Sequence, residues 1–234
     1  MRWLLGLTVC IGLVSLLLFR APDRDIQDRD FVFPLENVLS TTRPVRITVL
    51  GTSLSHRETW PDALSALLEV CLGEAVNIEV IAQPGANVVW GREQAERVVD
   101  TLPDLVLIEF ATNDADILDG VSLRKSRQLH SDLIEAMREG EPEPAVILLT
   151  MNPVSGLRGA VRPRLRAHND QYRALSEIYD TGFIDLAPRW RALANRDWSE
   201  DGLHPEKTVA AEIIAPTVAA YIVRSAGQGV LPSC

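Results

Sequence analysis

The 234-residue chain has no long run of basic residues, and its formal net charge at pH 7 is -9. Because binding to a phosphate backbone needs clustered lysine and arginine side chains, a nucleic-acid partner is not expected. The sequence also lacks internal repeats and low-complexity stretches, and apolar residues make up 47% of it. This composition is typical of a globular protein with one domain of ordinary size.

Metal-binding patterns are also absent from the sequence. None of the four histidines stands in an HxxxH or HExxH pattern, and no two of the three cysteines have metal-ligand spacing, so no zinc site is expected. A disulfide between Cys71 and Cys234 is compatible with the sequence, but spacing alone establishes no pairing. Isolated thiols are the simpler interpretation.

An apolar, uncharged run, Trp3–Phe19, lies near the start of the chain between two arginines. It is at the short end of the length of a membrane span. We interpret residues 1–20 as an uncleaved membrane anchor, with a cleaved signal peptide as the alternative. Residues 21–44 alternate arginine with aspartate and are typical of a charged linker. We expect the domain that follows to be exported, to the periplasm or the cell surface, although the flanking charges leave the orientation open.

From residue 45 the hydrophobic pattern alternates between strand and helix, and we expect one domain at 45–226 followed by a tail at 227–234. Predicted strands lie at 46–50, 76–82, 104–110, 145–151 and 182–186. Predicted helices lie at 60–72, 92–99, 122–139, 164–179 and 206–225. This alternation predicts a three-layer α/β/α sandwich on a mostly parallel sheet of about five strands. Sites in such sheets form beyond the carboxyl ends of the strands.

Three predicted strand ends and the segment before the last helix carry the residues that ester cleavage needs. The Ser53 hydroxyl is a poor nucleophile until a base removes its proton, and histidine does this best near neutral pH. Asp201 and His204 are three residues apart, so one loop can supply the base and the carboxylate that orients it. The backbone N–H groups of Ser53 and Gly85 and the Asn113 amide can bind the developing oxyanion.

In order and approximate spacing, these blocks resemble the motifs of the SGNH (GDSL-like) hydrolase superfamily over about residues 45–225. The sequence matches four family motifs: the serine of GDS, a glycine, the asparagine of GxND and the DxxH pair. The matched positions are Ser53, Gly85, Asn113, Asp201 and His204. The resemblance implies a flavodoxin-like fold and an esterase that needs neither a metal nor an organic cofactor. The G-x-S-x-G elbow of α/β-hydrolases is not present.

Two positions depart from the family motifs. Thr52 replaces the aspartate of GDS, and Ala111 replaces the first glycine of GxND. Neither position supplies a catalytic group in the family. The changes nevertheless leave open a hydrolase-like module that binds carbohydrate without turnover. Taken singly, each matched block is also compatible with a simple turn or helix cap.

Five further residues receive interpretations from the pattern alone. His56 is an alternative base, although at a helix entry it is expected to face solvent or line the cleft. Glu109, inside an apolar strand, is either a buried, paired carboxylate or a residue of the substrate cleft. Trp90 is a candidate wall of the cleft. His130 and His168 lie within predicted helices, and no role is assigned to them.

The expected function is hydrolysis of a short, acetyl-like acyl ester by a Ser-His-Asp triad. The substrate is expected to be a small-molecule or glycan ester, such as a cell-envelope polysaccharide, and the membrane is contacted through the N-terminal segment. The competing hypotheses are a lysophospholipase or thioesterase, an acyltransferase that uses the same serine, and the inactive carbohydrate-binding module.

Overall fold

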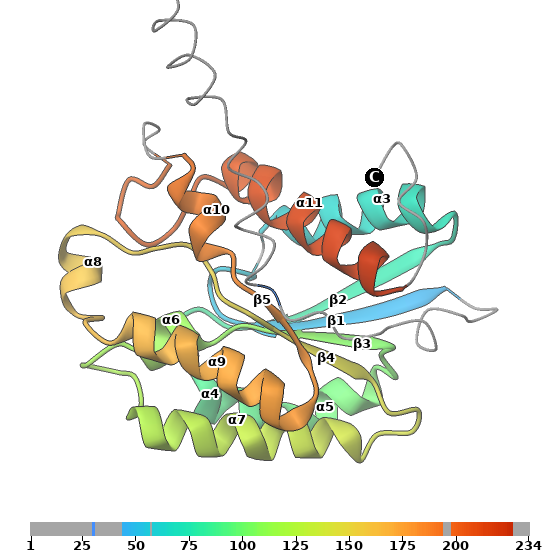
Figure 1. Cartoon of the computed structure of the whole chain (residues 1–234), viewed down its shortest axis with the longest axis horizontal. Helices are drawn as coiled ribbons and strands as arrows, with labels where there is room; N and C mark the ends of the chain where they lie inside the picture. Colours follow the sequence, from blue (N-terminus) through green and yellow to red (C-terminus); the bar gives the residue numbers. More distant parts are fainter. Residues whose placement is uncertain (1–29, 31–43, 57, 194–197, 227–234) are drawn as a thin grey trace, which may run out of the picture.

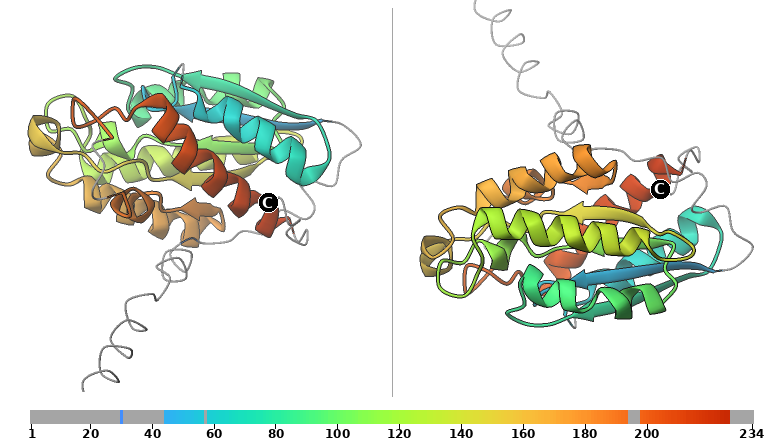
Figure 2. Two further views of the ribbon diagram at one scale, coloured as in Figure 1. Left: turned by 90° about the horizontal axis from the view of Figure 1, so that it is seen from above. Right: turned by 90° about the horizontal axis from the view of Figure 1, so that it is seen from below.

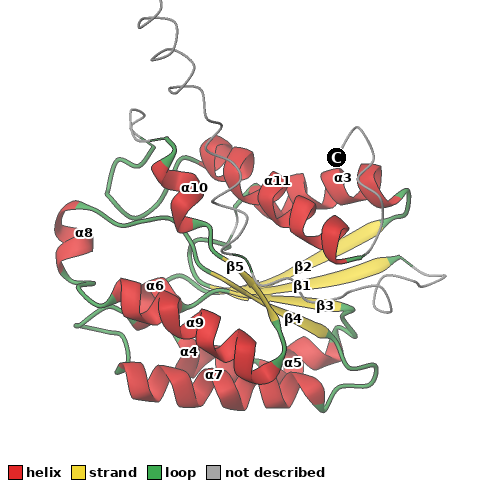
Figure 3. Cartoon of the chain, in the orientation of Figure 1, coloured by secondary structure: helices red, strands yellow, loops and turns green. Residues whose placement is uncertain are grey.

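Five parallel strands form the centre of the molecule (Figures 1 and 3). The computed structural model describes residues 30, 44–56, 58–193 and 198–226. The strands are β1 (Val45–Gly51), β2 (Val76–Ala82), β3 (Leu105–Ile108), β4 (Ala145–Leu149) and β5 (Gly182–Ile184). They lie in the order β2-β1-β3-β4-β5, and every neighbouring pair is parallel. The predicted five-stranded parallel sheet is confirmed.

Helices cover both faces of the sheet, as predicted. One face carries α3 (Trp60–Leu72) and α11 (Lys207–Ser225), with α10 (Ala187–Arg191) at their end (Figures 1 and 2). The opposite face carries α4 (Val88–Glu93), α5 (Ala95–Asp100), α7 (Leu123–Arg138) and α9 (Leu165–Tyr179). Two short helices, α6 (Ala111–Asp114) and α8 (Gly156–Ala160), lie beyond the carboxyl ends of β3 and β4.

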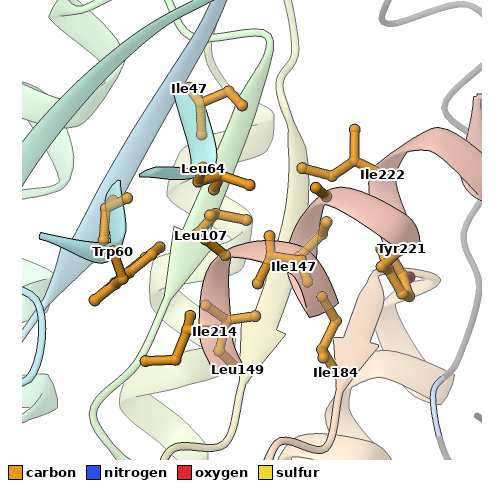
Figure 4. Close-up of a cluster of buried hydrophobic side chains, with 14 of the residues drawn as sticks. Ile47, Trp60, Leu64, Leu107, Ile147, Leu149, Ile184, Ile214, Tyr221 and Ile222 are labelled. Atoms are coloured by element: carbon orange, nitrogen blue, oxygen red, sulfur yellow. The ribbon is translucent and has the colours of Figure 1, made fainter. Parts of the chain in front are cut away.

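The two layers of helix explain why the central strands β3 and β4 are apolar throughout. Successive side chains of a strand point to opposite faces, so a strand with helices on both sides buries all of them. In β3, Leu105 and Leu107 join the core under α3 and α11, whereas Val106 and Ile108 join the core under the other helices. Figure 4 shows the first of these cores, where Leu107 packs among residues of β1, β4, α3 and α11.

Short local signals set several helix ends. The Asn87 side chain accepts a hydrogen bond from Val89 N at 2.9 Å and so begins α4 earlier than the predicted helix at 92–99, which is divided into α4 and α5. Gly73 has a φ of +69° and ends α3 in the left-handed conformation. The helices α6, α8 and α10 were not predicted, because four or five residues are too few to show a helical period.

The strand order reverses between β1 and β3, whose outgoing connections lead to opposite faces of the sheet. In open α/β sheets the crevice at such a switch point is the usual ligand site. Ser53 follows β1 and Asn113 follows β3, so both candidate site residues lie at this crevice.

Several expectations for the chain ends fall wholly or partly outside the described residues. Of residues 1–44, only Asp30 and Pro44 are described, and the tail at 227–234 is not. Asp30 lies in the predicted linker, and its buried carboxylate contacts Arg189 at 2.6 Å and Arg224 at 3.7 Å, so this residue packs on the domain. Among the described helices, only α11 is long and apolar enough to cross a membrane, and 56% of its most apolar window is buried inside the protein, as in a core helix.

One interpretation of the cysteines is corrected by the structure. Cys71, near the end of α3, is disulfide-bonded, whereas the sequence favoured an isolated thiol. Its partner lies outside the described residues. The spacing of three cysteines carries no information on which ends of a fold meet, which is why the sequence could not decide this point.

The packing of α3 can be tested with two adjacent leucines. Leu68 is fully buried in the core, whereas Leu67 is 36% exposed. Leu68→Ala is expected to lower the free energy of unfolding by about 2–5 kcal/mol, because it removes buried methyl groups and leaves a cavity. Leu67→Ala should cost less than about 1 kcal/mol. Denaturant unfolding measures both values, and equal losses would contradict the inward face assigned to α3.

Candidate active site

Ser53 lies in a tight turn directly after β1. The backbone N–H groups of Ser55 and His56 both donate to the carbonyl oxygen of Thr52, at 3.2 and 3.0 Å. The turn presents the Ser53 hydroxyl at the mouth of a pocket, which we call the Ser53 pocket. It has a volume of about 210 Å³. Its lining residues are Ser53, Pro84, Gly85, Asn113, Asp116, Asp119, Arg158, Arg162, Leu203 and His204.

Ser53, His204 and Asp201 form a hydrogen-bonded chain. Ser53 Oγ lies 2.9 Å from His204 Nε2, and His204 Nδ1 lies 2.8 Å from Asp201 Oδ2. The other oxygen of Asp201 accepts the backbone N–H groups of Leu203 at 2.9 Å and His204 at 2.7 Å. The loop that carries Asp201 and His204 therefore holds itself in shape through the same carboxylate that contacts the imidazole.

The charge of Asp201 sets the tautomer of His204. Desolvation acts against the charge, but the hydrogen bonds from His204 and Leu203 outweigh it, and the pKa of Asp201 lies well below its usual range. An ionised carboxylate has no proton to donate, so His204 Nδ1 must donate to it. Nε2 is then left to accept the Ser53 proton, as a general base requires.

Three potential oxyanion donors border the Ser53 pocket. Within the described part of the chain, the backbone N–H groups of Ser53 and Gly85 have no hydrogen-bond acceptor. Asn113 Nδ2 donates one hydrogen to Ala86 O at 2.9 Å, which fixes the amide and leaves its second N–H for another acceptor. Gly85 has a φ of +77°, a conformation that favours glycine.

Glu109 is a buried, paired carboxylate, and it does not line the Ser53 pocket. Oε1 accepts hydrogen bonds from Thr52 N at 2.6 Å and Ser55 Oγ at 2.8 Å, and Oε2 accepts one from Thr52 Oγ1 at 3.1 Å. A Cβ atom at Gly51 would lie 2.2 Å from Glu109 Oε1, so only glycine fits beside this carboxylate. Glu109 thus holds both sides of the turn that presents Ser53. Thr52, which departs from the family motif, supplies two of the three donors.

A buried polar network lies beneath the loop that carries Asn113, and His130 is part of it. The Tyr172 hydroxyl accepts the backbone N–H groups of Phe110 at 2.8 Å and Ala111 at 3.1 Å. Its own hydrogen is therefore left for His130 Nε2 at 2.9 Å, and His130 Nδ1 donates to Ser126 O at 2.9 Å. Burial lowers the pKa of His130 to about 4, so this ring is neutral at pH 7.

Asp114 extends this network to the loop of Gly85. Its carboxylate accepts hydrogen bonds from Ser126 Oγ at 2.6 Å and from Val88 N at 2.8 Å, at the start of α4. Burial raises the pKa of Asp114 to about 6, and these two bonds partly offset the effect. The loops that supply Gly85 and Asn113 are therefore fixed to each other and to α7. No role for His130 could be predicted, because helical periodicity does not show that α7 faces these strand ends.

Three other residues considered from the sequence lie outside the Ser53 pocket. His56 Nδ1 lies 2.9 Å from Ala82 O, and His56 does not line the Ser53 pocket. Trp90 is likewise absent from the lining and packs edge-on against Phe110 at a centroid distance of 6.4 Å. His168 is buried on α9, also outside the pocket. Among the described residues, no group of three or more histidine, cysteine, aspartate or glutamate side chains could hold a metal ion.

Arg162 is a site residue that the sequence did not indicate. Its side chain is 5% exposed, lines the Ser53 pocket and forms an ion pair with Asp116 at 2.9 Å. It also donates to the carbonyl oxygens of Thr112 at 2.9 Å and Arg158 at 3.0 Å. Arg162 thus joins α6 to α8 beside Ser53. An arginine among several in one polar stretch gives no signal that it will be buried.

The fold is an α/β/α sandwich, and the family to which the chain belongs makes it a carboxylic ester hydrolase. The chain belongs to the GDSL-like lipase/acylhydrolase family, whose model matches residues 42–210. The resemblance to SGNH hydrolases predicted from the sequence is thereby confirmed.

Solved structures share the fold at low sequence identity. A lipase/acylhydrolase from Enterococcus faecalis has a TM-score of 0.64 and 21% identity, over 76% of this chain and 95% of its own. A catalytic mutant of an acetylxylan esterase from Geobacillus stearothermophilus has a TM-score of 0.62 and 17% identity, over 80% of this chain and 96% of its own. A carbohydrate acetylesterase family member from Sinorhizobium meliloti has a TM-score of 0.63 and 15% identity, over 79% of this chain and 100% of its own. A sequence search of curated proteins found no match.

The burial of Glu109 predicts a pH-dependent stability. Burial raises its pKa from 4.5 to about 7, with Asp114 adding to the effect and Thr52 and Ser55 acting against it. Between these values the native state holds a proton that the unfolded state releases, so stability falls as the pH rises. Glu109→Gln removes the titrating group. As the pH rises from about 5 to about 8, the free energy of unfolding of this variant should therefore increase by about 1–3 kcal/mol relative to that of the wild type.

Denaturant unfolding at both pH values measures the difference. Glu79→Gln, at an exposed position of β2, is the matched control and should follow the wild type. If the unfolding free energies of Glu109→Gln and the wild type change in parallel with pH, Glu109 is not the group that titrates.

Proposed function

We propose that this protein is a serine esterase that removes short acyl groups, acetyl in the first place, from a hydroxyl-rich substrate. The observation that carries the proposal is the hydrogen-bonded chain of Ser53, His204 and Asp201 beside a small polar pocket. A histidine with a free basic nitrogen toward a serine hydroxyl is the arrangement that activates an oxygen nucleophile.

The reaction follows from the positions of these groups. Ser53 Oγ attacks the ester carbonyl carbon while its proton passes to His204 Nε2, and Asp201 stabilises the imidazolium. The N–H groups of Ser53 and Gly85 and the Asn113 amide bind the oxyanion. His204 then gives the proton to the alcohol oxygen as the C–O bond breaks. A water molecule, deprotonated by His204, attacks the acyl-enzyme, and the carboxylic acid leaves as Ser53 is protonated again.

The lining of the Ser53 pocket supports a short acyl group. Of the described residues that line it, only Pro84 and Leu203 have apolar side chains, and the remainder offer glycine, hydroxyl, amide, imidazole or charged groups. A long alkyl chain there would desolvate Asp116, Asp119 and Arg158 without hydrogen bonds in return. An acetyl group is small and needs much less apolar surface in the pocket to pack against.

A glycan is the proposed source of the alcohol, and the cell envelope is the proposed location. The acetylxylan esterase and the carbohydrate acetylesterase family member act on carbohydrates by description, and we propose the same class of alcohol here. The proposed anchor at residues 1–20 would hold the domain on the exported side of a membrane. The disulfide bond of Cys71 supports this location, because disulfides persist mainly in oxidising compartments.

A lipid ester or thioester is a second candidate substrate, and one observation favours it. Of the exposed large hydrophobic side chains in the described residues, the three most exposed are Ile117, Leu118 and Leu157, at 64%, 73% and 88%. They neighbour Asp116, Asp119 and Arg158 of the Ser53 pocket along the chain. An apolar rim of this kind suits an acyl chain that runs outward over the surface, as in a lysophospholipase.

An acyltransferase and an inactive carbohydrate-binding module would be built on the same site. An acyltransferase would form the same acyl-enzyme and pass the acyl group to an acceptor other than water. An inactive module would not need His204 to face Ser53 with a basic nitrogen. The departures at Thr52 and Ala111 leave this hydrogen bond in place, which supports turnover.

Acyl specificity separates the two candidate substrates. The short-acyl proposal predicts that kcat/KM for p-nitrophenyl esters falls by about tenfold or more from acetate to octanoate, because the octanoyl chain has no apolar pocket to enter. The initial rates for the ester series measure this, with Ser53→Ala as the control that should be inactive. A rise in kcat/KM with chain length would instead support the lipid ester.

The role of Asp201 can be tested by an isosteric change. In Asp201→Asn, Oδ1 can still accept the N–H groups of Leu203 and His204, but an amide nitrogen faces His204 Nδ1. The ring must then place its proton on Nε2, which can no longer accept the Ser53 proton, and kcat should fall by roughly 10²–10⁴. Steady-state kinetics measure the loss, and circular dichroism checks that the fold survives. Unchanged turnover in the folded variant would remove Asp201 from the proposed triad.

A further inference from the structure

A second and larger hollow lies beside the Ser53 pocket, beyond the carboxyl ends of β4 and β5. We call it the β4–β5 groove. Its volume is about 770 Å³, compared with about 210 Å³ for the Ser53 pocket, and it is within the usual range of ligand sites. The segments 153–156 and 185–191 and the start of α9 form its walls. Figure 1 shows the helices α8, α9 and α10 to which these segments lead.

The groove and the Ser53 pocket share a wall. Arg162 lines both, and its ion pair and hydrogen bonds to the surrounding residues fix it between them. Ser155, another groove residue, donates its backbone N–H to Gly202 O at 2.9 Å. A Cβ atom at Gly202 would lie 2.7 Å from Ser155 O. The groove therefore lies against the loop that carries Asp201 and His204.

The proposed reaction assigns different sides of Ser53 to the two oxygens of the ester. The carbonyl oxygen must face the donors at Gly85 and Asn113. The alcohol oxygen must face His204, because the imidazolium returns its proton to that oxygen. The alcohol portion of the substrate therefore leaves the Ser53 pocket on the side of the His204 loop, where the groove lies.

The chemistry of the groove matches hydroxyl groups. Arg166 and Arg191 offer N–H donors, Asp170 and Asp185 offer carboxylate acceptors, and Asn169 offers both. A sugar hydroxyl donates one hydrogen bond and accepts others, so a surface with both kinds of group can satisfy it. A hydrocarbon chain would desolvate these charges without compensation.

We propose that the β4–β5 groove binds the alcohol portion of the substrate, a chain of several linked neutral sugar units, while the acyl group enters the Ser53 pocket. The inference rests on the proposed function and adds a subsite to it. The enzyme would then select its substrate through the length and hydroxyl pattern of the glycan, and its Ser53 pocket would accept only short acyl groups.

Kinetics with one activated ester and a glycan series test the subsite. The substrates are p-nitrophenyl acetate and acetylated xylo-oligosaccharides of increasing length, and the variants are Arg166→Ala/Arg191→Ala and the control Arg97→Ala. In the wild type, kcat/KM should rise about tenfold from the shortest to the longest glycan, as more units reach the groove. In the double variant, kcat/KM should no longer rise with glycan length, because KM for the longer glycans increases. The decrease in its kcat/KM relative to the wild type should be about fivefold or more larger for the longest glycan than for p-nitrophenyl acetate. Arg97, exposed on α5 and outside the groove, should give a variant with wild-type ratios.

Binding without turnover separates failure of the groove from failure of the esterase. Isothermal titration of the unacetylated tetrasaccharide into Ser53→Ala should give binding that Arg166→Ala/Arg191→Ala weakens by about tenfold. Absence of this binding, or a kcat/KM independent of glycan length in an active wild type, would overturn the groove assignment. Binding that is retained in a protein with no activity toward any ester would instead reject the esterase proposal alone.

Discussion

The hydrogen bond between Ser53 and His204 joins residues 151 positions apart in the sequence, and the arrangement of the site depends on it. It requires the turn after β1 and the loop before α11 to meet at one edge of the sheet. No local interaction accomplishes this. It follows from the packing of α11 and α3 on the face of the sheet where Ile47 and Leu107 are buried, so the apolar core sets the geometry of the polar site. The Asp201 carboxylate then needs to organise only its own short loop.

Buried carboxylates perform the same task on the strands that end at the pocket. Glu109 holds the turn of Ser53, and Asp114 joins the loop of Asn113 to the start of α4. Burial disfavours the charge on both. Donors from the turn of Ser53 partly compensate it for Glu109, and Ser126 of α7 and the Val88 N–H do so for Asp114. The two groups also repel each other when ionised, which contributes to the raised pKa of Glu109. The site is thus built on a layer of polar interactions that costs stability at neutral pH and ties the loops together through hydrogen bonds.

Much of this architecture could be predicted from the sequence, because it depends on periodicity. Strands that are apolar throughout, such as Leu105–Ile108, alternate with helical segments along the chain, and this alternation leaves few folds other than a parallel α/β sandwich. Ser53 and Asn113 could be identified because they stand at strand ends. What the sequence could not show was determined by contacts between distant segments. The partners of Glu109, the position of His130 beneath a strand end and the burial of Arg162 depend on side-chain directions that no local pattern encodes. The groove beside the Ser53 pocket is likewise formed by loops that meet only in the folded chain.

The central claim is that Ser53 is an activated nucleophile with His204 as its base. Treatment of the full-length protein with a fluorophosphonate, followed by mass spectrometry, tests this without knowledge of the natural substrate, because the probe reacts only with a serine that a base has activated. Ser53 should be the one modified residue, Ser53→Ala should not be labelled, and labelling should be slowed by roughly 10² or more in His204→Ala. A folded protein that stays unlabelled, or that is labelled on a different serine, would contradict this claim.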